Sequence, residues 1–143
     1  MYTPRQALVA HLDSSGIVDT VKPHEGEIPR AVSQQNPAAL TGLMPAALVM
    51  IEGGDVTNDR FFDASIFMAV RTRALDLSAS EDDGLQLVEE TAFWLDDNRR
   101  FKHDGETFEV ATDGVGSRPI EMDLIVVSPD FTIVEVAFSM QWY

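Results

Sequence analysis

The chain has 143 residues, of which 45% are hydrophobic, and this fits a single globular domain with a core of its own. Asp and Glu number 24 against 10 Lys and Arg, so the formal net charge is -14. A surface this acidic excludes proteins that bind DNA or RNA by neutralising phosphates, and it excludes adsorption to an anionic membrane. The absence of cysteine excludes disulfides, thiolate nucleophiles and cysteine-ligated zinc.

Two further absences bear on the compartment. The first residues lack the apolar segment of a signal peptide, and no apolar run approaches the roughly 18 residues that cross a bilayer. We therefore expect a cytosolic protein that has no membrane partner.

Short elements are expected in the first half of the chain, where turn residues recur. The patterns predict a helix over 3–16, a strand over 17–21, a helical turn over 36–42 and a strand over 46–52. Residues 22–36 are polar and contain Pro23, Gly26 and Pro29, so we expect a long polar loop or arm there.

Longer elements are expected in the second half. Residues 61–73 alternate with a period of two and predict a long strand with one apolar face. The later patterns predict a helix from Ser80 to about Asn98, a strand over 107–112, and an antiparallel hairpin of 120–128 with 131–142. This order predicts one α+β domain over residues 1–143, with an antiparallel four- or five-stranded sheet and helices packed mainly on one face.

The candidate catalytic groups do not form a recognised constellation. The histidines, His11, His24 and His103, have no ligand spacing, and we interpret them as surface or structural residues. The glycine pattern at Gly114–Ser117 completes neither the dinucleotide-binding nor the Walker phosphate loop. The sequence therefore predicts a protein that is not an enzyme, with no catalytic residue, no metal ligand and no cofactor.

Acidic residues crowd the predicted long helix. Between residues 81 and 97 the chain carries seven acids and no base: Glu81, Asp82, Asp83, Glu89, Glu90, Asp96 and Asp97. Such a run is commonly only a solvated helix face, and neighbouring aspartates on a helix do not face each other as an acid–base pair does. The size of the run makes an electrostatic surface for a partner the alternative interpretation.

Aromatic residues follow an apolar strand face at Trp142 and Tyr143. Chain ends normally fray, so we expect this end either to pack deeply or to meet another subunit. The loop expected after residue 53 is a second candidate contact region. The candidate interface residues are Trp142, Tyr143, Asp55, Asn58 and Arg60.

A succession of features along the chain resembles a known family. The features are the capped first helix, the run Leu43–Met50, the Gly53-Gly54 turn, the strand ending in Val70–Arg73, the helix segment Gly84–Glu89 and the late pair of strands. In this order they resemble the small tail-terminator and tail-completion proteins of long-tailed bacteriophages, including Mu-like and lambda-like phages and prophages.

The resemblance implies a structural protein of the virion tail that is assembled in the bacterial cytoplasm. Such proteins are α+β subunits that form a ring, commonly a hexamer, which caps the tail tube and docks the head connector. The implied partners are copies of the same chain, the tail-tube protein and the head-connector protein. DNA passes through the bore without sequence-specific binding, and an acidic lumen that repels phosphates agrees with the net charge.

Two other functions stay open from the sequence. One is a small-molecule-binding or enzymatic α+β domain whose pocket lies between the sheet and the long helix, lined by Phe67, Trp94 and Phe138. The other is an acidic inhibitor that mimics nucleic acid, which the charge of -14 favours.

Overall fold

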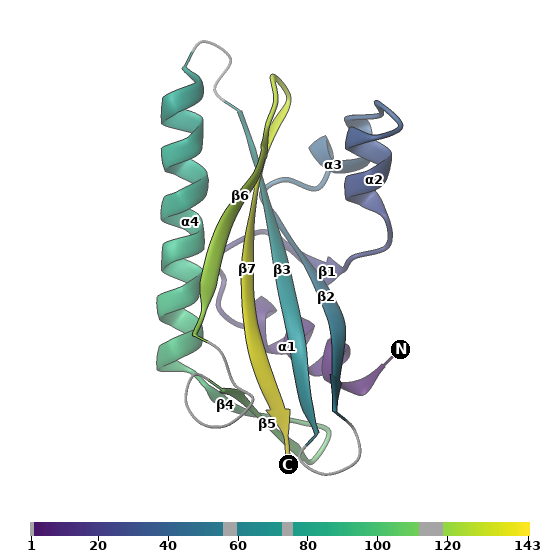
Figure 1. Cartoon of the computed structure of the whole chain (residues 1–143), viewed down its shortest axis with the longest axis vertical. Coiled ribbons are helices and arrows are strands. Elements are labelled where there is room, and N and C mark those ends of the chain that lie inside the picture. The colour runs from purple at the N-terminus through teal and green to yellow at the C-terminus, as the bar shows by residue number, and fades with distance from the viewer. Residues whose placement is uncertain (1, 56–59, 73–75, 112–118) are drawn as a thin grey trace.

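A computed structural model of the chain describes residues 2–55, 60–72, 76–111 and 119–143. Strands make up 42% and helices 33% of these residues. The elements in chain order are α1 (Thr3–Asp13), β1 (Thr20–Pro23), α2 (Glu27–Val32), α3 (Ala38–Thr41), β2 (Ala46–Asp55), β3 (Phe61–Arg71), α4 (Leu77–Asp97), β4 (Arg100–His103), β5 (Glu106–Ala111), β6 (Glu121–Val127) and β7 (Phe131–Trp142). Together they form an elongated body whose long axis follows β3, β7 and α4 (Figure 1).

The sheet is built around β7, its longest strand. With 12 residues, β7 pairs with β3 along one edge and with both β6 and β5 along the other. β2 and β1 follow beyond β3, and β4 follows beyond β5, so the seven strands of the described residues belong to one sheet. β1 and β2 run parallel, and the other described pairs are antiparallel.

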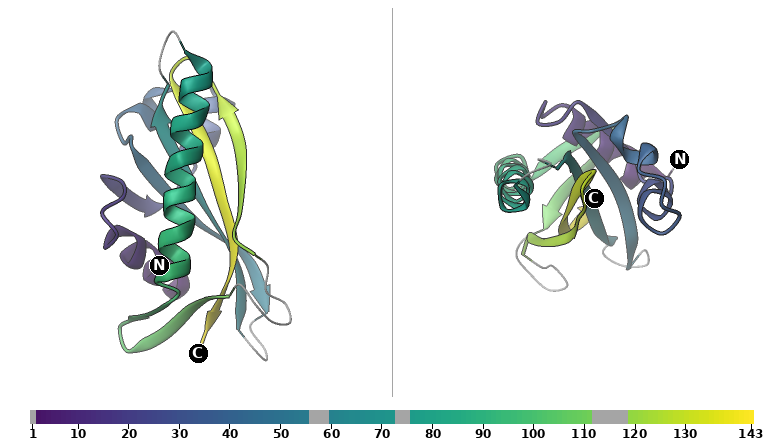
Figure 2. Two further views of the ribbon diagram at one scale, coloured as in Figure 1. Left: turned by 90° about the vertical axis from the view of Figure 1, so that its left-hand side faces the viewer. Right: turned by 90° about the horizontal axis from the view of Figure 1, so that it is seen from above.

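The predicted antiparallel sheet of four or five strands is therefore wrong, because the structure has a curled, mixed sheet of six to seven strands (Figure 2). One reason lies after α4, where the chain continues into β4, turns at Asp104–Gly105 and pairs with β5. The other reason is the parallel pairing of β1 with β2. A parallel pair needs a crossover connection, and the segment that holds α2 and α3 supplies it.

That segment includes residues 22–36, and the prediction of a loop throughout them is wrong because α2 forms there. Gly26 precedes the helix with a φ of 93°, a left-handed conformation that glycine adopts without strain. Pro29 lies in the first turn of α2, where backbone N–H groups lack intrahelical acceptors in any case. The residues that read as breakers therefore begin a helix.

Helices cover both faces of the sheet, so the expectation that they pack mainly on one face is also wrong. α4 lies on one side of the sheet, and α2 with α3 lies on the other (Figure 1). The alternation along β3 separates two cores: Ile66 and Met68 pack with α1 and α4, whereas Phe67 and Ala69 pack with α2 and α3. The larger core receives Ala7, Leu8, Leu12, Val88 and Leu95 from the two helices.

α4 begins at Leu77, three residues before the predicted cap. The carboxylate of Asp76 accepts the N–H of Ala79 at 2.9 Å and so caps the helix. Ser80 is buried, and its hydroxyl donates to the carbonyl oxygen of Asp76 at 3.1 Å. The sequence pattern predicts the cap at Ser80 and not at Asp76, because the acids that follow Ser80 are typical of the first turn of a helix.

The other strands form where the sequence predicts them, but some of their ends differ. The hairpin of the last two strands is confirmed, with β6 antiparallel to β7. β2 continues through Gly53 and Gly54 to Asp55 after a register shift at Ile51/Gly53, so the predicted end at the glycines is wrong. β3 ends at Arg71, and Arg73 lies outside the described residues.

Candidate interaction surface

His11 lies half-buried in α1 and stacks on aromatic rings. Its ring centroid is 3.9 Å from that of Phe101 and 4.6 Å from that of Trp94, and Nε2 lies 2.8 Å from the carbonyl oxygen of Asn98. Burial lowers the pKa of His11 and outweighs the opposite effect of the contact with Asn98. The imidazole thus joins α1 to the end of α4, which is a structural role.

The other histidines lie apart from it. His24 packs beside Phe67, with ring centroids 5.7 Å apart, and burial is the main cause that lowers the pKa of His24. Nε2 of His103 is 3.5 Å from the carboxylate of Asp104. Within the described ranges, no three His, Cys, Asp or Glu side chains are placed to hold a metal ion.

Glu27 is a buried carboxylate, with 2% of its surface exposed. Its oxygens accept the N–H of Glu25 at 2.6 Å and lie 3.3 Å from Nζ of Lys22. Burial favours the neutral forms of both side chains. Hydrogen bonds from backbone N–H groups, and then the contact with Lys22, outweigh burial and lower the pKa of Glu27. The carboxylates of Glu25 and Glu27 likewise raise the pKa of Lys22. A carboxylate held in its charged form is a poor proton acceptor, so this cluster anchors α2 to β1.

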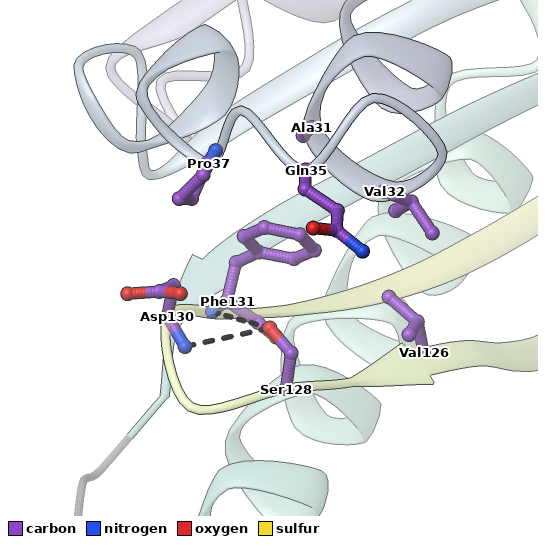
Figure 3. A pocket seen from close by; sticks show the side chains of 8 residues that line it. All are labelled: Ala31, Val32, Gln35, Pro37, Val126, Ser128, Asp130 and Phe131. Carbon is purple, nitrogen blue, oxygen red and sulfur yellow. Dashed lines mark hydrogen bonds between the residues drawn. The ribbon is translucent and has the colours of Figure 1, made fainter.

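A hollow of about 360 Å³ lies between α2 and the turn that joins β6 to β7 (Figure 3). Its floor is apolar, with Val32, Val126 and Phe131 around it. The hydroxyl of Ser128 accepts the N–H groups of Asp130 and Phe131 at 3.4 and 3.2 Å and donates to the carbonyl of Phe131 at 3.1 Å. Ser128 therefore holds the turn together and is not arranged as a nucleophile.

The pocket expected around Phe67, Trp94 and Phe138 is not formed by these residues. Phe138 is fully buried in the core beneath α4, whereas Phe67 packs on the opposite face of the sheet. Residues on opposite faces of one sheet cannot line one cavity. The binding function based on that pocket loses its proposed site.

The acids of α4 divide by exposure. Glu81 and Asp83 are half-buried, and the exposed members are Asp82, Glu89, Glu90, Asp96 and Asp97. Helical periodicity places Asp82, Glu89 and Asp96 on one outward stripe, each separated by seven residues. Phe93 interrupts the stripe and is 63% exposed.

Trp142 and Tyr143 lie at the end of the molecule where the chain finishes (Figure 1). Arginine side chains lie over both rings. Cζ of Arg60 is 4.2 Å from the Trp142 ring centroid, and Cζ of Arg100 is 5.0 Å from the Tyr143 ring centroid. The Trp142 ring also stacks on Phe108, with ring centroids 5.6 Å apart. We call Arg60, Arg100, Trp142 and Tyr143 the cationic end.

The cationic end contains three of the five predicted interface residues. Tyr143 is 51% exposed, whereas Trp142 is half-buried. Arg100 was missed by sequence reasoning because only the pairing of β5 with β7 brings β4 beside the end of the chain. Asn58 lies outside the described residues, as does the side chain of Asp55.

An apolar strip lies where α4 passes beside β6. We define it by four side chains: Phe93, Ile120, Met122 and Leu124. Met122 is 54% and Leu124 37% exposed, and they pair with residues of β7 that lie in the core beneath α4. Paired residues of antiparallel strands share a face, so both side chains lie on the α4 side of the sheet. Phe93 and Ile120 line a shallow hollow of about 300 Å³ beside them.

β6 is an edge strand, since within the described residues it pairs with β7 alone. Natural edge strands are commonly short, covered or charged, because a free edge pairs with other chains. β6 has seven residues, and three of its apolar side chains are exposed: Met122, Leu124 and Ile125. Its only charged residues are Glu121 and Asp123. Exposed apolar side chains beside a free strand edge are typical of a surface that another chain covers.

Sequence reasoning missed the apolar strip. Phe93 lies one position outside the predicted apolar stripe of the helix, and an aromatic side chain on a charged helix face was the available signal. The run Glu121–Leu124 alternates acidic and apolar residues, which also fits a strand with one side in the core. Exposure on both sides follows only from the position of β6 at the edge of the sheet.

No protein-family model matches the chain, and no curated protein is similar enough to count as a match. None of the helices in the described ranges combines the length and the apolarity that crossing a membrane requires.

Proposed function

We propose that this protein is a structural subunit that assembles with copies of itself into a ring, as do the phage tail-terminator and tail-completion proteins that its sequence resembles. The observation that carries the proposal is the apolar strip beside the free edge of β6. Met122 and Phe93 expose more than half of their surfaces there, although 28 apolar residues in the part of the chain that the structure describes are buried. A chain that can bury so much apolar surface, and leaves this strip exposed, has a use for it outside the monomer.

The ring explains the charge as well. With a net charge of -14, a ring of copies surrounds its bore with a negative potential. DNA that moves through such a bore is not retained by phosphate contacts. In this proposal the ring ends the tail tube and receives the head connector, and its activity consists of protein–protein contacts.

Light scattering coupled to size exclusion tests the proposal. We expect the chain to change from monomer to a closed oligomer as its concentration rises from the low micromolar to the millimolar range. Met122→Glu adds a charge to the apolar strip and should shift this transition to higher concentration. Val32→Glu is the matched control, because Val32 is 42% exposed on α2, away from the strip. A wild-type chain that is monomeric throughout the range contradicts the proposal.

A further inference from the structure

The segment that carries α2 and α3 lies over the smaller core as a lid. We define the lid as residues 25–44, which include both helices (Figure 1). Beneath it lie Leu48 of β2 and Phe131 and Ile133 of β7, all buried. Because these side chains are apolar, opening of the lid would expose apolar surface to solvent.

The lid has little packing of its own. α2 has six residues and α3 has four, and helices this short are not stable without tertiary contacts. α2 buries Ala31 in the smaller core, but Val32 is 42% exposed and the hollow of about 360 Å³ separates the helix from the β6–β7 turn (Figure 3). A segment with few buried contacts opens at a lower free energy than the rest of its domain.

Polar contacts at one end hold α2 in place. Glu27 is paired with Lys22 of β1 at 3.3 Å. His24 makes a second contact, because its Nε2 accepts the backbone N–H of Ile28 at 3.4 Å. The ring of His24 lies against Phe67 of β3, with ring centroids 5.7 Å apart. His24 thus links the first turn of α2 to the sheet.

The hydrogen bond to His24 exists only with the neutral ring. A neutral imidazole has one nitrogen that accepts a hydrogen bond, whereas a protonated imidazole has two N–H donors. A proton on Nε2 would point at the N–H of Ile28, so the contact would become repulsive. The ring is also half-buried, and burial is the main cause that lowers the pKa of His24.

Charged groups on α2 and β1 surround His24. The carboxylate of Glu27 favours the protonated ring, whereas Arg30 and Lys22 disfavour it. Glu27 lies 3.3 Å from Lys22 and 3.9 Å from Arg30, and Lys22 lies 3.2 Å from the exposed Glu25. Two carboxylates are thus matched by two cations, and a protonated His24 adds a third cation to the cluster.

The other elements near His24 offer few titratable groups. α3 has the sequence AALT and contains none. Along β2 the first titratable residue is Glu52, which is exposed. Phe67 faces His24 from β3, and Glu135 of β7, which pairs with Phe67, accepts the hydroxyl of Ser65. The response of the lid to pH therefore depends on His24 and on the cluster around it.

Beyond the proposed ring, we infer that the lid is a pH-sensitive switch: protonation of His24 releases α2 from the sheet and exposes Phe131 and Ile133. Opening starts at the α2 end, because the guanidinium of Arg71 holds the α3 end by donating to the carbonyl oxygen of Thr41 at 3.0 Å and does not titrate. The stabilisation that His24 gives the closed lid is complete above its ordinary pKa of 6.5. It is lost as the pH falls through the lowered folded-state value.

Single cysteines measure the opening, because the chain has none of its own. Ala31→Cys places a thiol in the smaller core, where Ala31 is 4% exposed, and Val32→Cys places one on the exposed part of α2. Both are labelled with dithiodipyridine, and the ratio of the first rate to the second corrects for the titration of the thiol itself. We expect this ratio to rise at least about threefold from about pH 7.5 to about pH 5.5.

Three control variants locate the opening. Ala64→Cys places a thiol in the larger core, where Ala64 is fully buried, and it should stay unlabelled over the same pH range. His24→Phe, combined with Ala31→Cys and with Val32→Cys, keeps an aromatic ring but cannot gain a proton, so the ratio should no longer change with pH. His11→Phe should leave the change intact, because His11 lies on α1.

Each outcome decides the inference. A ratio that does not change with pH while His24 is present overturns it, and so does a ratio that still changes in His24→Phe. If Ala64→Cys is labelled together with Ala31→Cys, the whole domain unfolds and the lid is not a switch. Light scattering at the same pH values tests the ring separately, since a monomeric chain with a responsive lid contradicts the ring and supports the switch.

Discussion

The two faces of the β3–β7 pair are built differently. The face beneath α1 and α4 is apolar along most of its length, with fully buried side chains such as Ile66, Val136 and Phe138. A polar contact lies at the end of the strands, where the hydroxyls of Thr72 and Thr132 are 2.9 Å apart. The opposite face is apolar only where α2 and α3 cover it. Farther along the same strands it is polar: Ser65 donates to Glu135 at 2.9 Å and Ser139 donates to Asp63 at 3.3 Å.

The difference shows that a strand's two faces can depend on separate forces. Packing stabilises the α4 face, so its stability should respond mainly to volume and depend on pH less than that of the other face. The α2 face is attached through the ion pair of the buried Glu27 with the half-buried Lys22 and through hydrogen bonds, so its stability should respond to charge and pH. Substitutions on the two faces therefore differ both in the size of their effects and in the conditions that reveal them.

The largest expected effect is on the α4 face, from Phe138→Ala. The side chain is fully buried, so its removal leaves a cavity and should lower the free energy of unfolding by about 3 to 5 kcal/mol. Urea unfolding followed by circular dichroism measures it. Phe93→Ala is the matched control, because Phe93 is 63% exposed and its loss should change the stability of the monomer by less than about 0.5 kcal/mol. Equal losses in the two variants would mean that the face is not a packed core.

The second effect is on the α2 face, from Glu27→Gln. Loss of the charge leaves Lys22 without its buried partner, and we expect about 2 kcal/mol less stability at neutral pH. Because the pKa of Glu27 is lowered in the folded state, its contribution is complete above the ordinary value of 4.5. The contribution is lost as the pH falls through the folded-state pKa.

Unfolding free energies measured from neutral pH down to pH values below 4.5 check this dependence. The wild type should approach the variant at the acidic end of the range. Glu25→Gln is the control, since the Glu25 side chain is 64% exposed and should change the pH dependence little. If the difference in unfolding free energy between wild type and Glu27→Gln does not change with pH, the charge of Glu27 does not stabilise this face.

A smaller effect returns to the α4 face and tests how tightly it is packed. Gly84→Ala should raise the stability of α4 by about 1 kcal/mol through helix propensity. A Cβ at this position, however, lies 2.8 Å from Cγ2 of the buried Val134, and such overpacking costs about 1 to 3 kcal/mol. We expect a net loss of about 1 kcal/mol in urea unfolding. Gln86→Ala, on the exposed side of α4, is the control and should leave the stability unchanged or raise it. If Gly84→Ala raises the stability instead, α4 packs less tightly against β7 than the structure indicates.

The sequence was sufficient for the α4 face and insufficient for the other. The alternation of residues 61–73 and the stripe of Leu85, Val88 and Leu95 correctly place apolar side chains between the long helix and a sheet. The covering of the opposite face depends on residues 22–36, where Pro29 and Gly26 indicate a loop although they begin α2. Local patterns do not distinguish a helix start from a turn when the same residue types serve both.

The candidate surfaces depended on tertiary structure in the same way. Trp142, Tyr143 and Arg60 could be selected from the sequence as exposed or terminal residues, but Arg100 joins them only through the ladder from β4 to β7. β6 and β7 have similar apolar content, and their sequences do not show which is central. β7 is buried because β3 flanks one edge and β5 and β6 the other, whereas β6 keeps a free edge.

The smallest effect concerns the rim of the α4 face, where His11 is a titratable group stacked against Phe101 and Trp94. Burial lowers the pKa of His11, so the unfolded chain binds its proton more readily than the folded chain does. The contribution of His11 is therefore complete above the ordinary pKa of 6.5 and is lost as the pH falls through the folded-state value.

His24, whose pKa burial also lowers, contributes in the same pH range from the α2 side. His11→Phe keeps the stack and removes the charge, so it should reduce the slope of stability against pH below 6.5, by less than about 1 kcal/mol in total. If the slope is unchanged in His11→Phe and disappears in His24→Phe, the pH dependence belongs to the α2 face alone, and the contrast between the two faces becomes sharper.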